Sequence, residues 1–413
     1  MKTDTTNQAG TQPEHFPPPV ATQPTATRMW FAWAVPGFFL MACYFQISIF
    51  GFNMSGWTWL GGFLCGAVVL LQTGTGQVAM PFQYWMPWVA MVLLYLSPWF
   101  DNALQSAAQI VCPLLVGMAA STLRPSQQQL DSLAKTFRAV AVAFLAAVVV
   151  IRLPMLLMGR LPEAISAMIF QSFFLCSYLL QRKKIDLVLY LACAAVPVIA
   201  LTRGPVLGSM ALVLLTLAPL SLSRRLLIAV LAILIGLGVF YSARFQQKMF
   251  WSGRGTLSDV SFDNPNMRTH TRDLMWRRLW TGVQEKPWLG HGGNADATDL
   301  LAAGFPTYLP HNDWVRILFN YGIVGCALYV AAMLLQLLHG RQWAGVAPPS
   351  TQVFLYAALT GFVPYMAVMF TDNILIYAQF YGNLHFLLLG LGYGSLAAEQ
   401  ERAAYEAEIA KQT

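Results

Sequence analysis

Apolar residues gather in long runs that recur along this chain from Met29 almost to its C-terminus. Each run is long enough, or nearly so, for a helix to cross a hydrocarbon layer about 30 Å thick. The runs fall at 29–50, 57–72, 85–100, 103–120, 138–152, 163–180, 185–202, 206–222, 225–241, 313–338, 353–370 and 374–396. This pattern predicts an all-α polytopic membrane protein with about twelve transmembrane helices.

The segments between these runs divide the chain into domains. Residues 1–28 are rich in Pro, Thr and Gln and lack an apolar core, which indicates a disordered cytoplasmic tail and not a cleavable signal. We expect transmembrane helices 1–9 within 29–241, a loop domain outside the membrane within 242–312, and transmembrane helices 10–12 within 313–396. Residues 397–413 would form a second cytoplasmic tail.

Composition narrows the class of function. The 413 residues are 57% hydrophobic and only 10% charged, whereas soluble proteins carry about 25% charged residues. This excludes a disordered chain, a disulfide scaffold and a nucleic-acid binder, and it leaves a transporter, a channel, a receptor or a membrane enzyme. The six cysteines lie inside apolar runs without a CxxC pair, so we expect packing residues and neither a zinc site nor a disulfide framework. We also expect no cofactor.

The positive residues indicate how the chain is oriented. Basic residues cluster in alternate connections, at Arg182–Lys184, Arg224–Arg225 and Arg341, and also near both termini. Because cytoplasmic loops of membrane proteins are enriched in Lys and Arg, both termini are predicted to be cytoplasmic. The segment 242–310 then lies outside, although it holds eight basic residues. Either this loop binds an anionic ligand, or it is a solvated loop that escapes the charge rule.

A helix is expected inside that loop, at 271–285. Thr271 could cap it, Pro287 would stop it, and its apolar surface would come from Leu274, Trp276, Leu279, Trp280 and Val283. Such a helix could lie at the membrane interface or form a packed lid.

Three outer features carry candidate chemistry: Arg203 in a Thr-Arg-Gly-Pro turn, Arg272 with Trp276 one helical turn later, and His311 with Asn312. Guanidinium groups present planar forks of N–H donors to phosphate oxygens, and two of them can hold a diphosphate without a metal ion. A histidine, whose ordinary pKa is about 6.5, can take a proton from a hydroxyl near neutral pH.

Simpler roles for these residues stay open. Arg203 could only reach lipid headgroups, Arg272 could pair with a loop carboxylate, and His311 could cap the helix that follows it. Asp313 and Arg316 could brace His311 or pair with each other across one helical turn. Asp372 is a weaker candidate for orienting a base or an arginine.

The order of these motifs resembles a known signature. The matching residues are Arg272-x-x-x-Trp276, Pro287-x-x-Gly290-x-Gly292 and His311-Asn312, followed by Leu318, Tyr321, Gly322-Ile323 and Gly325. This order is similar to the signature of the bacterial O-antigen ligase and polymerase superfamily, and Thr202-Arg203-Gly204-Pro205 resembles its Ser/Thr-Arg-Gly turn. The resemblance implies a GT-C-like fold in the bacterial inner membrane, with the active site and the large loop on the periplasmic side.

The resemblance also implies a reaction. A glycan would pass from an undecaprenyl-diphosphate-linked O-antigen donor to a lipid A-core acceptor. A single direct displacement would invert the anomeric configuration, and because the chain lacks an Asp-x-Asp motif, we predict no metal requirement. His311, Arg203 and Arg272 would be catalytic, and Arg203, Arg272, Asn312 and Trp276 would bind substrate among the membrane lipids. Gly290 and Gly292 would shape the backbone.

Other functions remain alternatives to this ligase. An O-antigen polymerase and a protein O-oligosaccharyltransferase belong to the same superfamily. A lipid-linked glycan transporter is the alternative from another class, but the predicted spans are almost free of charged residues near their centres, where a transporter would need them.

Overall fold

The computed structural model describes residues 28–45, 47–96, 103–152, 164–261, 263–269 and 271–412, and these are mostly helical. The predicted N-terminal tail, apart from Arg28, lies outside the described residues. The first nine predicted spans hold α1 (Trp30–Tyr44), α2 (Met54–Thr73), α3 (Met86–Leu94), α4 (Ala103–Ser121), α5 (Gln127–Ala147), α7 (Ala164–Gln181), α8 (Lys184–Ile199), α9 (Arg203–Leu214) and α10 (Leu222–Phe240).

The remaining elements follow the predicted division of the chain. The loop contains α11 (Ala243–Met249), α12 (Arg272–Glu285) and α13 (Ala295–Ala302), and the last three spans hold α14 (Asp313–Ala344), α15 (Pro349–Met369) and α16 (Asn383–Gln412). A small antiparallel hairpin pairs β1 (Ser48–Ile49) with β2 (Phe52–Asn53). Short 3-10 or π turns cover Thr75–Gln77, Phe82–Tyr84, Val148–Arg152, Leu257–Asp259, Ile374–Ile376 and Ala378–Gly382.

Each of the twelve predicted segments thus holds a helix, but not every helix is long and apolar enough to span a membrane. Within the described ranges, seven helices are long and apolar enough to cross a membrane. They are Met54–Thr73, Ala103–Ser121, Gln127–Val150, Ala164–Gln181, Leu222–Phe240, Asp313–Ala344 and Pro349–Met369. The all-α membrane architecture agrees with the prediction, whereas twelve spans and a periplasmic loop stay predictions. The predicted C-terminal tail continues α16 as a helix through Gln412.

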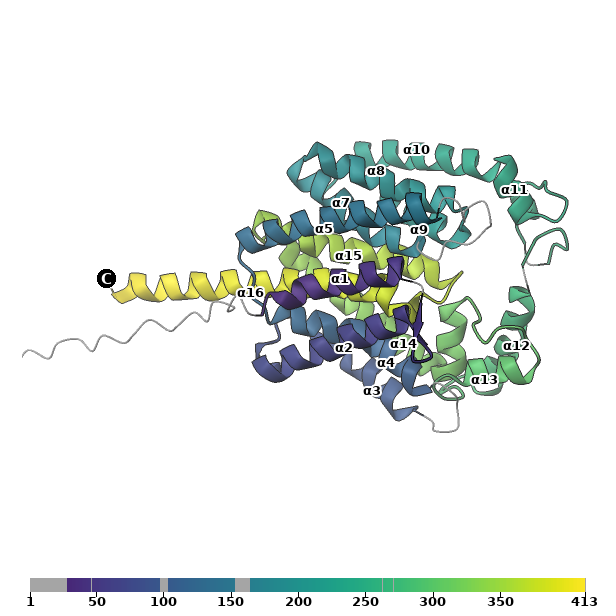
Figure 1. The fold of residues 1–413 in the computed structure, drawn as a ribbon, viewed down its shortest axis with the longest axis horizontal. Coiled ribbons are helices and arrows are strands. Elements are labelled where there is room, and N and C mark those ends of the chain that lie inside the picture. Colours follow the sequence, from purple (N-terminus) through teal and green to yellow (C-terminus); the bar gives the residue numbers. More distant parts are fainter. Residues whose placement is uncertain are drawn as a thin grey trace, which may run out of the picture.

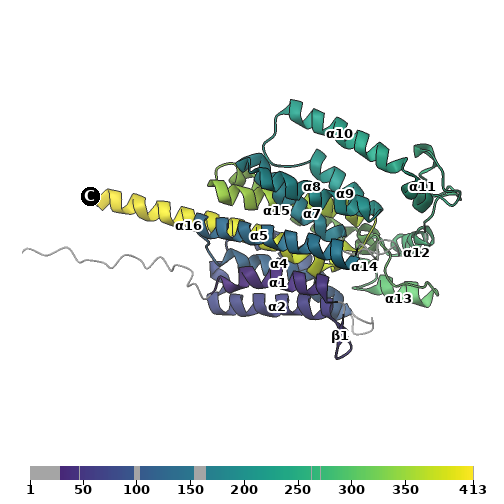
Figure 2. The ribbon, with the colours of Figure 1, turned by 45° about the horizontal axis from the view of Figure 1, so that its top comes forward.

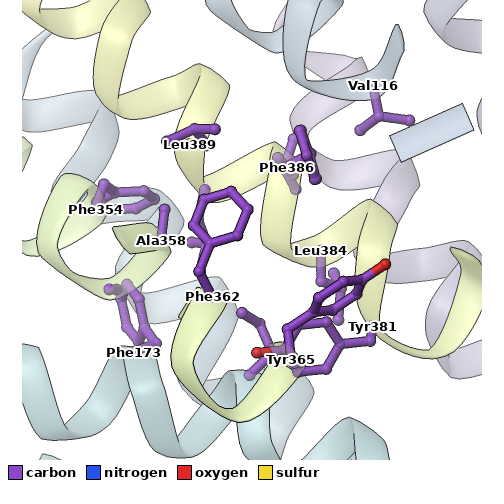
Figure 3. Packing of buried hydrophobic residues seen from close by; sticks show 14 of the residues in the cluster. Val116, Phe173, Phe354, Ala358, Phe362, Tyr365, Tyr381, Leu384, Phe386 and Leu389 are labelled. Carbon is purple, nitrogen blue, oxygen red and sulfur yellow. The ribbon is translucent and has the colours of Figure 1, made fainter. Parts of the chain in front are cut away.

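The core of the bundle forms where α15 meets α7 and α16. In Figure 3, Phe354, Ala358, Phe362 and Tyr365 follow one face of α15, opposite Leu384, Phe386 and Leu389. Small residues also let α16 approach α4 closely, since a Cβ on Gly390 of α16 would lie 2.1 Å from the carbonyl oxygen of Gly117 on α4. Gly390 therefore has no room for a side chain.

The two ends of the bundle carry different parts of the chain. Figures 1 and 2 show α11, α12 and α13 at one end, while the C-terminal part of α16 leaves the opposite end. In both views α10 runs along the outer edge of the bundle. The loop elements and the C-terminus therefore lie at opposite ends of the helical bundle.

Candidate active site

A break in α14 shapes the end of the bundle that carries α12 and α13. Gly322 has φ +65° and ψ −169°, which interrupts α14 and divides it into 313–321 and 323–344. Glycine adopts this backbone conformation at little steric cost. A Cβ on Gly322 would also lie 2.3 Å from the carbonyl oxygen of Trp288. Any other residue here would therefore strain the backbone and collide with Trp288.

The loop 287–293 fills the break and takes over backbone hydrogen bonds that the helix loses there. These bonds are His291 N to Phe319 O (2.9 Å), Gly292 N to Asn320 O (2.9 Å), Ile323 N to Pro287 O (2.7 Å) and Val324 N to Trp288 O (3.1 Å). Gly290 has φ +71°, and a Cβ there would lie 2.6 Å from Asn320 O. The predicted backbone-shaping role of the Pro287–Gly292 motif is confirmed, and its partner is the broken helix.

The short segment 313–321 packs with the loop helices. Phe319 forms a separate apolar cluster with Met275, Leu279 and Val283 of α12 and with Ala295 and Leu300. The predicted apolar face was partly wrong, because Leu274 and Trp280 are about half exposed and Met275 takes the buried place. The predicted cap was also wrong: Thr271 has a left-handed backbone and makes no side-chain cap hydrogen bond. This helix is packed on its neighbours through one face.

A buried ion pair fixes 313–321 against α13. Arg316 Nε lies 3.3 Å from Asp296 Oδ2, and both side chains are almost fully buried. Asn320 binds Asp296 in both directions, through Nδ2 to Oδ1 (2.8 Å) and through its own Oδ1 to Asp296 N (3.0 Å). Arg316 therefore pairs with Asp296 and not with Asp313, whose carboxylate accepts a hydrogen bond from Leu375 N at 2.7 Å.

His311 stands immediately before α14 in a strained conformation. Its φ of +53° is in the left-handed region, which non-glycine residues adopt mostly where function or packing requires it. Its backbone N–H donates to Asn373 Oδ1 at 3.0 Å. The turn around Asn373 therefore holds His311 in place through the backbone.

The same turn orients the imidazole ring of His311. Nδ1 lies 3.0 Å from Asp372 Oδ1 and 3.2 Å from Asn373 Nδ2. The carboxylate can only accept a hydrogen bond from Nδ1, whereas the Asn373 amide nitrogen could only donate one to it. Because the bond to the carboxylate is charge-assisted and stronger, we assign the neutral tautomer with its proton on Nδ1. That assignment leaves the Nε2 lone pair available as a base, and the side chain is 26% exposed. Asp372 thus contacts the His311 ring, as an orienting residue would, and the role of His311 as a base stays a prediction.

The carboxylate of Asp372 is ionised in this setting. Burial raises its pKa, but the hydrogen bond from His311, the Asn373 N–H and the charge of Arg272 outweigh burial, so the pKa lies below its ordinary value. An ionised Asp372 stabilises a positive charge on His311 after proton uptake.

Asn312 and Trp276 support the position of His311. The Asn312 side chain accepts a hydrogen bond from Val315 N at 3.1 Å and is the N-cap of α14. The alternative that His311 caps this helix is therefore wrong. Trp276 Nε1 donates to the carbonyl oxygen of Pro310 at 2.6 Å. Both side chains hold the backbone on either side of His311, and their binding of substrate stays a prediction.

Arg272 and Arg203 reach the same turn as His311. Arg272 Nη1 donates to the carbonyl oxygen of Thr371 at 2.9 Å, one residue before Asp372. Gly204 packs against Thr371 so closely that a Cβ would lie 2.2 Å from its Oγ1, which places Arg203 beside this turn. The structure therefore brings Arg272 and His311 to one turn, with Arg203 near Arg272.

Two further cations join the arginines, and sequence patterns did not single them out. Arg203 Nη2 donates to the carbonyl oxygen of Arg268 at 3.0 Å, and the Arg268 guanidinium lies over the Trp251 ring at 4.5 Å. Burial and the charges of Arg203 and Arg272 lower the pKa of Lys248. Each residue is one of many basic residues in the loop, so only their contacts distinguish them.

Positive charge therefore exceeds negative charge around this turn. Burial is also the main cause that lowers the pKa of Arg272, and the charge of Asp372 opposes it. Among the described residues, Arg272 lies beside Asp372, which is already hydrogen-bonded to His311. Arg203 and Lys248 lie near Arg272, and Arg268 lies near Arg203. We call Arg203, Lys248, Arg268 and Arg272 the cation cluster. Such a cluster attracts an anion with several phosphate oxygens.

No three His, Cys, Asp or Glu side chains come together to form a metal site in the part of the chain that the structure describes. Independence from metal ions stays a prediction.

Comparisons with known proteins agree with the resemblance found in the sequence. The family model described as O-antigen ligase matches residues 188–330, a range that includes all five predicted site residues. An O-antigen ligase of Pseudomonas aeruginosa is 33% identical over 79 residues, which is 19% of this chain and 19% of that protein. The aligned part thus spans about a fifth of the relative.

The buried Arg316–Asp296 pair predicts a large loss of stability when one partner is neutralised. We expect Asp296→Asn to lower the free energy of unfolding by about 3–5 kcal/mol, because it leaves a buried guanidinium without its charge partner. The measurement is the apparent melting temperature of the purified protein in detergent. The control is Asp263→Asn, which removes the exposed partner of Arg277 and should change little. Equal melting temperatures for Asp296→Asn and the unaltered protein would contradict this account.

Proposed function

We propose that this protein, a member of the O-antigen ligase superfamily, transfers a glycan from a polyprenyl-diphosphate donor to a hydroxyl of an acceptor. The proposed donor is the undecaprenyl-diphosphate-linked O-antigen, and the proposed acceptor is the lipid A-core oligosaccharide. One observation carries the proposal: Arg272, a member of the cation cluster, and the His311–Asp372 pair meet at a single turn, at residues 371–373.

The proposed reaction is one direct displacement. The acceptor oxygen attacks the anomeric carbon of the donor sugar, and its new bond forms as the bond from that carbon to the diphosphate oxygen breaks. The hydroxyl proton passes to His311 Nε2, and Asp372 stabilises the resulting imidazolium. A single displacement inverts the anomeric configuration, and undecaprenyl diphosphate leaves.

The cation cluster would serve the leaving group. Negative charge grows on the diphosphate as the sugar bond breaks, and partly buried, preorganised cations stabilise that charge more strongly than water does. Arg203 and Arg272 would bind the phosphates directly, while Lys248 and Arg268 add charge around them. Because these side chains supply the charge that a divalent ion supplies in other transferases, we propose a metal-independent reaction.

The arrangement of the bundle supports the proposed topology. The candidate site lies at the end that carries α11–α13, and α16 leaves the other end (Figure 1). Basic residues of the connections at 182–184 and 224–225 lie away from the site, as the positive-inside bias expects for a cytoplasmic face. We therefore propose a bacterial inner-membrane protein with cytoplasmic termini and a periplasmic active site.

The identity of the acceptor defines the first experiment. The purified protein is given a lipid-linked glycan together with lipid A-core, with more donor, or with an acceptor protein. We expect product only on lipid A-core, which a ligase requires. Longer lipid-linked glycan would identify a polymerase instead, and glycosylated protein would identify the third activity of the superfamily. The absence of product from all three reactions would contradict glycan transfer itself.

Substitutions test the roles of the site residues in the same assay. We expect His311→Ala to lower the rate by about 10²- to 10⁴-fold, because it removes the base. Arg272→Ala should lower donor turnover by at least about tenfold, because a charged hydrogen bond is lost. The matched control is Arg277→Ala, which removes an exposed arginine of the same helix. Equal rates for Arg272→Ala and Arg277→Ala, at equal protein abundance, would remove Arg272 from the mechanism.

Chelation tests the absence of a metal ion from the reaction. We expect the rate of glycan transfer to be unchanged after EDTA treatment, since the cation cluster already carries the required charge. The control is the unaltered protein assayed before and after added Mg²⁺ or Mn²⁺. A loss of activity with EDTA that either ion restores would contradict the metal-independent mechanism.

A further inference from the structure

A second basic site lies at the other end of the bundle. A cavity of about 550 Å³ opens between the α9–α10 connection, the first turn of α10, the end of α14 and the first half of α15. The helices α9 and α14 begin beside the candidate active site and run away from it, so the cavity lies at the end opposite to α11–α13 (Figure 1). This site is independent of the proposed reaction.

Three arginines line this cavity: Arg224, Arg225 and Arg341. Its lining, as far as the structure describes the chain, contains no Asp or Glu, and none of the three arginines forms an ion pair with a described residue. Orientation of the chain requires basic residues on this side, but it does not require three guanidinium groups to share one cavity. The cavity therefore suits an anion.

Arg225 gives the cavity a fixed wall. Its Nη1 donates to Thr216 O at 2.9 Å, and its Nη2 and Nε donate to Ala218 O at 3.3 Å and Leu220 O at 3.4 Å. The connection is also tied to α15, since Leu217 N donates to Thr360 Oγ1 at 3.1 Å. The guanidinium of Arg225 is thus half-buried and held by carbonyl oxygens, and no carboxylate among the described residues pairs with it.

An apolar surface continues from this cavity along α10. None of the residues in the apolar window of α10 is buried, and the exposed side chains nearest to the cavity include Leu222, Leu226, Leu227 and Val230. Figure 2 shows α10 along the outer edge of the bundle. A ligand of the cavity would therefore meet charge at one end of α10 and a hydrocarbon-like surface beyond it.

We propose that this cavity binds the headgroup of an anionic phospholipid. The phosphate lies among Arg224, Arg225 and Arg341. The N–H donors of Arg224 and Arg341 match its oxygens, while Arg225, whose guanidinium is held by carbonyl oxygens, adds positive charge. The acyl chains follow the exposed apolar face of α10. A soluble phosphate would share the headgroup contacts but would have no use for α10, so the apolar surface favours the lipid.

The test measures lipid binding to the full-length protein by native mass spectrometry in detergent. The probes are phosphatidylglycerol and, as a zwitterionic comparison, phosphatidylcholine. The variant Arg224→Gln with Arg341→Gln removes two exposed charges and leaves Arg225, which holds the connection, unchanged. The matched control is Lys183→Gln with Lys184→Gln, which removes two exposed charges at the same end of the bundle outside the cavity.

The proposal predicts a preference for phosphatidylglycerol and its selective loss. Two arginines near an anionic headgroup contribute about a thirtyfold difference in affinity, so the arginine variant should lose about that factor while the lysine variant keeps the preference. Equal losses in both variants would reduce the effect to general attraction and overturn the proposal. Displacement of phosphatidylglycerol by inorganic phosphate at the same concentration would also overturn it, in favour of a soluble anion.

Discussion

Positive charge held partly out of water, with too little negative charge to neutralise it, is the constraint on which the rest of this structure depends. Arg203, Lys248 and Arg272 influence one another through their charges, and the nearest carboxylate, Asp372, is already hydrogen-bonded to His311. Such a cluster is costly without an anion. We propose that a diphosphate would offset this cost on entering the site, where it would lie beside the histidine proposed as the base.

The surrounding fold keeps His311 in place beside this cluster. The break at Gly322 separates the segment 313–321 from the rest of α14. The loop 287–293 forms hydrogen bonds with the backbone groups that the break leaves without helical partners. The buried Arg316–Asp296 pair then fixes that segment against α13. As a result His311, which stands just before this segment, is held by the packed segment on one side and by the turn at 371–373 on the other.

Part of this arrangement could be predicted from the sequence, because local patterns encode it. Apolar runs predicted where helices form, and the motifs around Arg203, Arg272 and His311 identified three residues that the structure brings together. Lys248, Arg268 and Asn373 could not be found in this way, since each looks like any other polar loop residue until the chain folds. Met275 displaced Leu274 from the buried face of α12 because the neighbouring helices decide which side is covered.

The central claim, that the cation cluster and His311 share one ligand, is tested most directly by a cryo-electron microscopy structure of the protein with undecaprenyl diphosphate bound. The account predicts that the two phosphates lie between the guanidinium groups of Arg203 and Arg272. The outer phosphate, which carries the sugar in the donor, should face Nε2 of His311. A diphosphate bound away from both arginines, or an imidazole that faces a different cavity, would contradict the account.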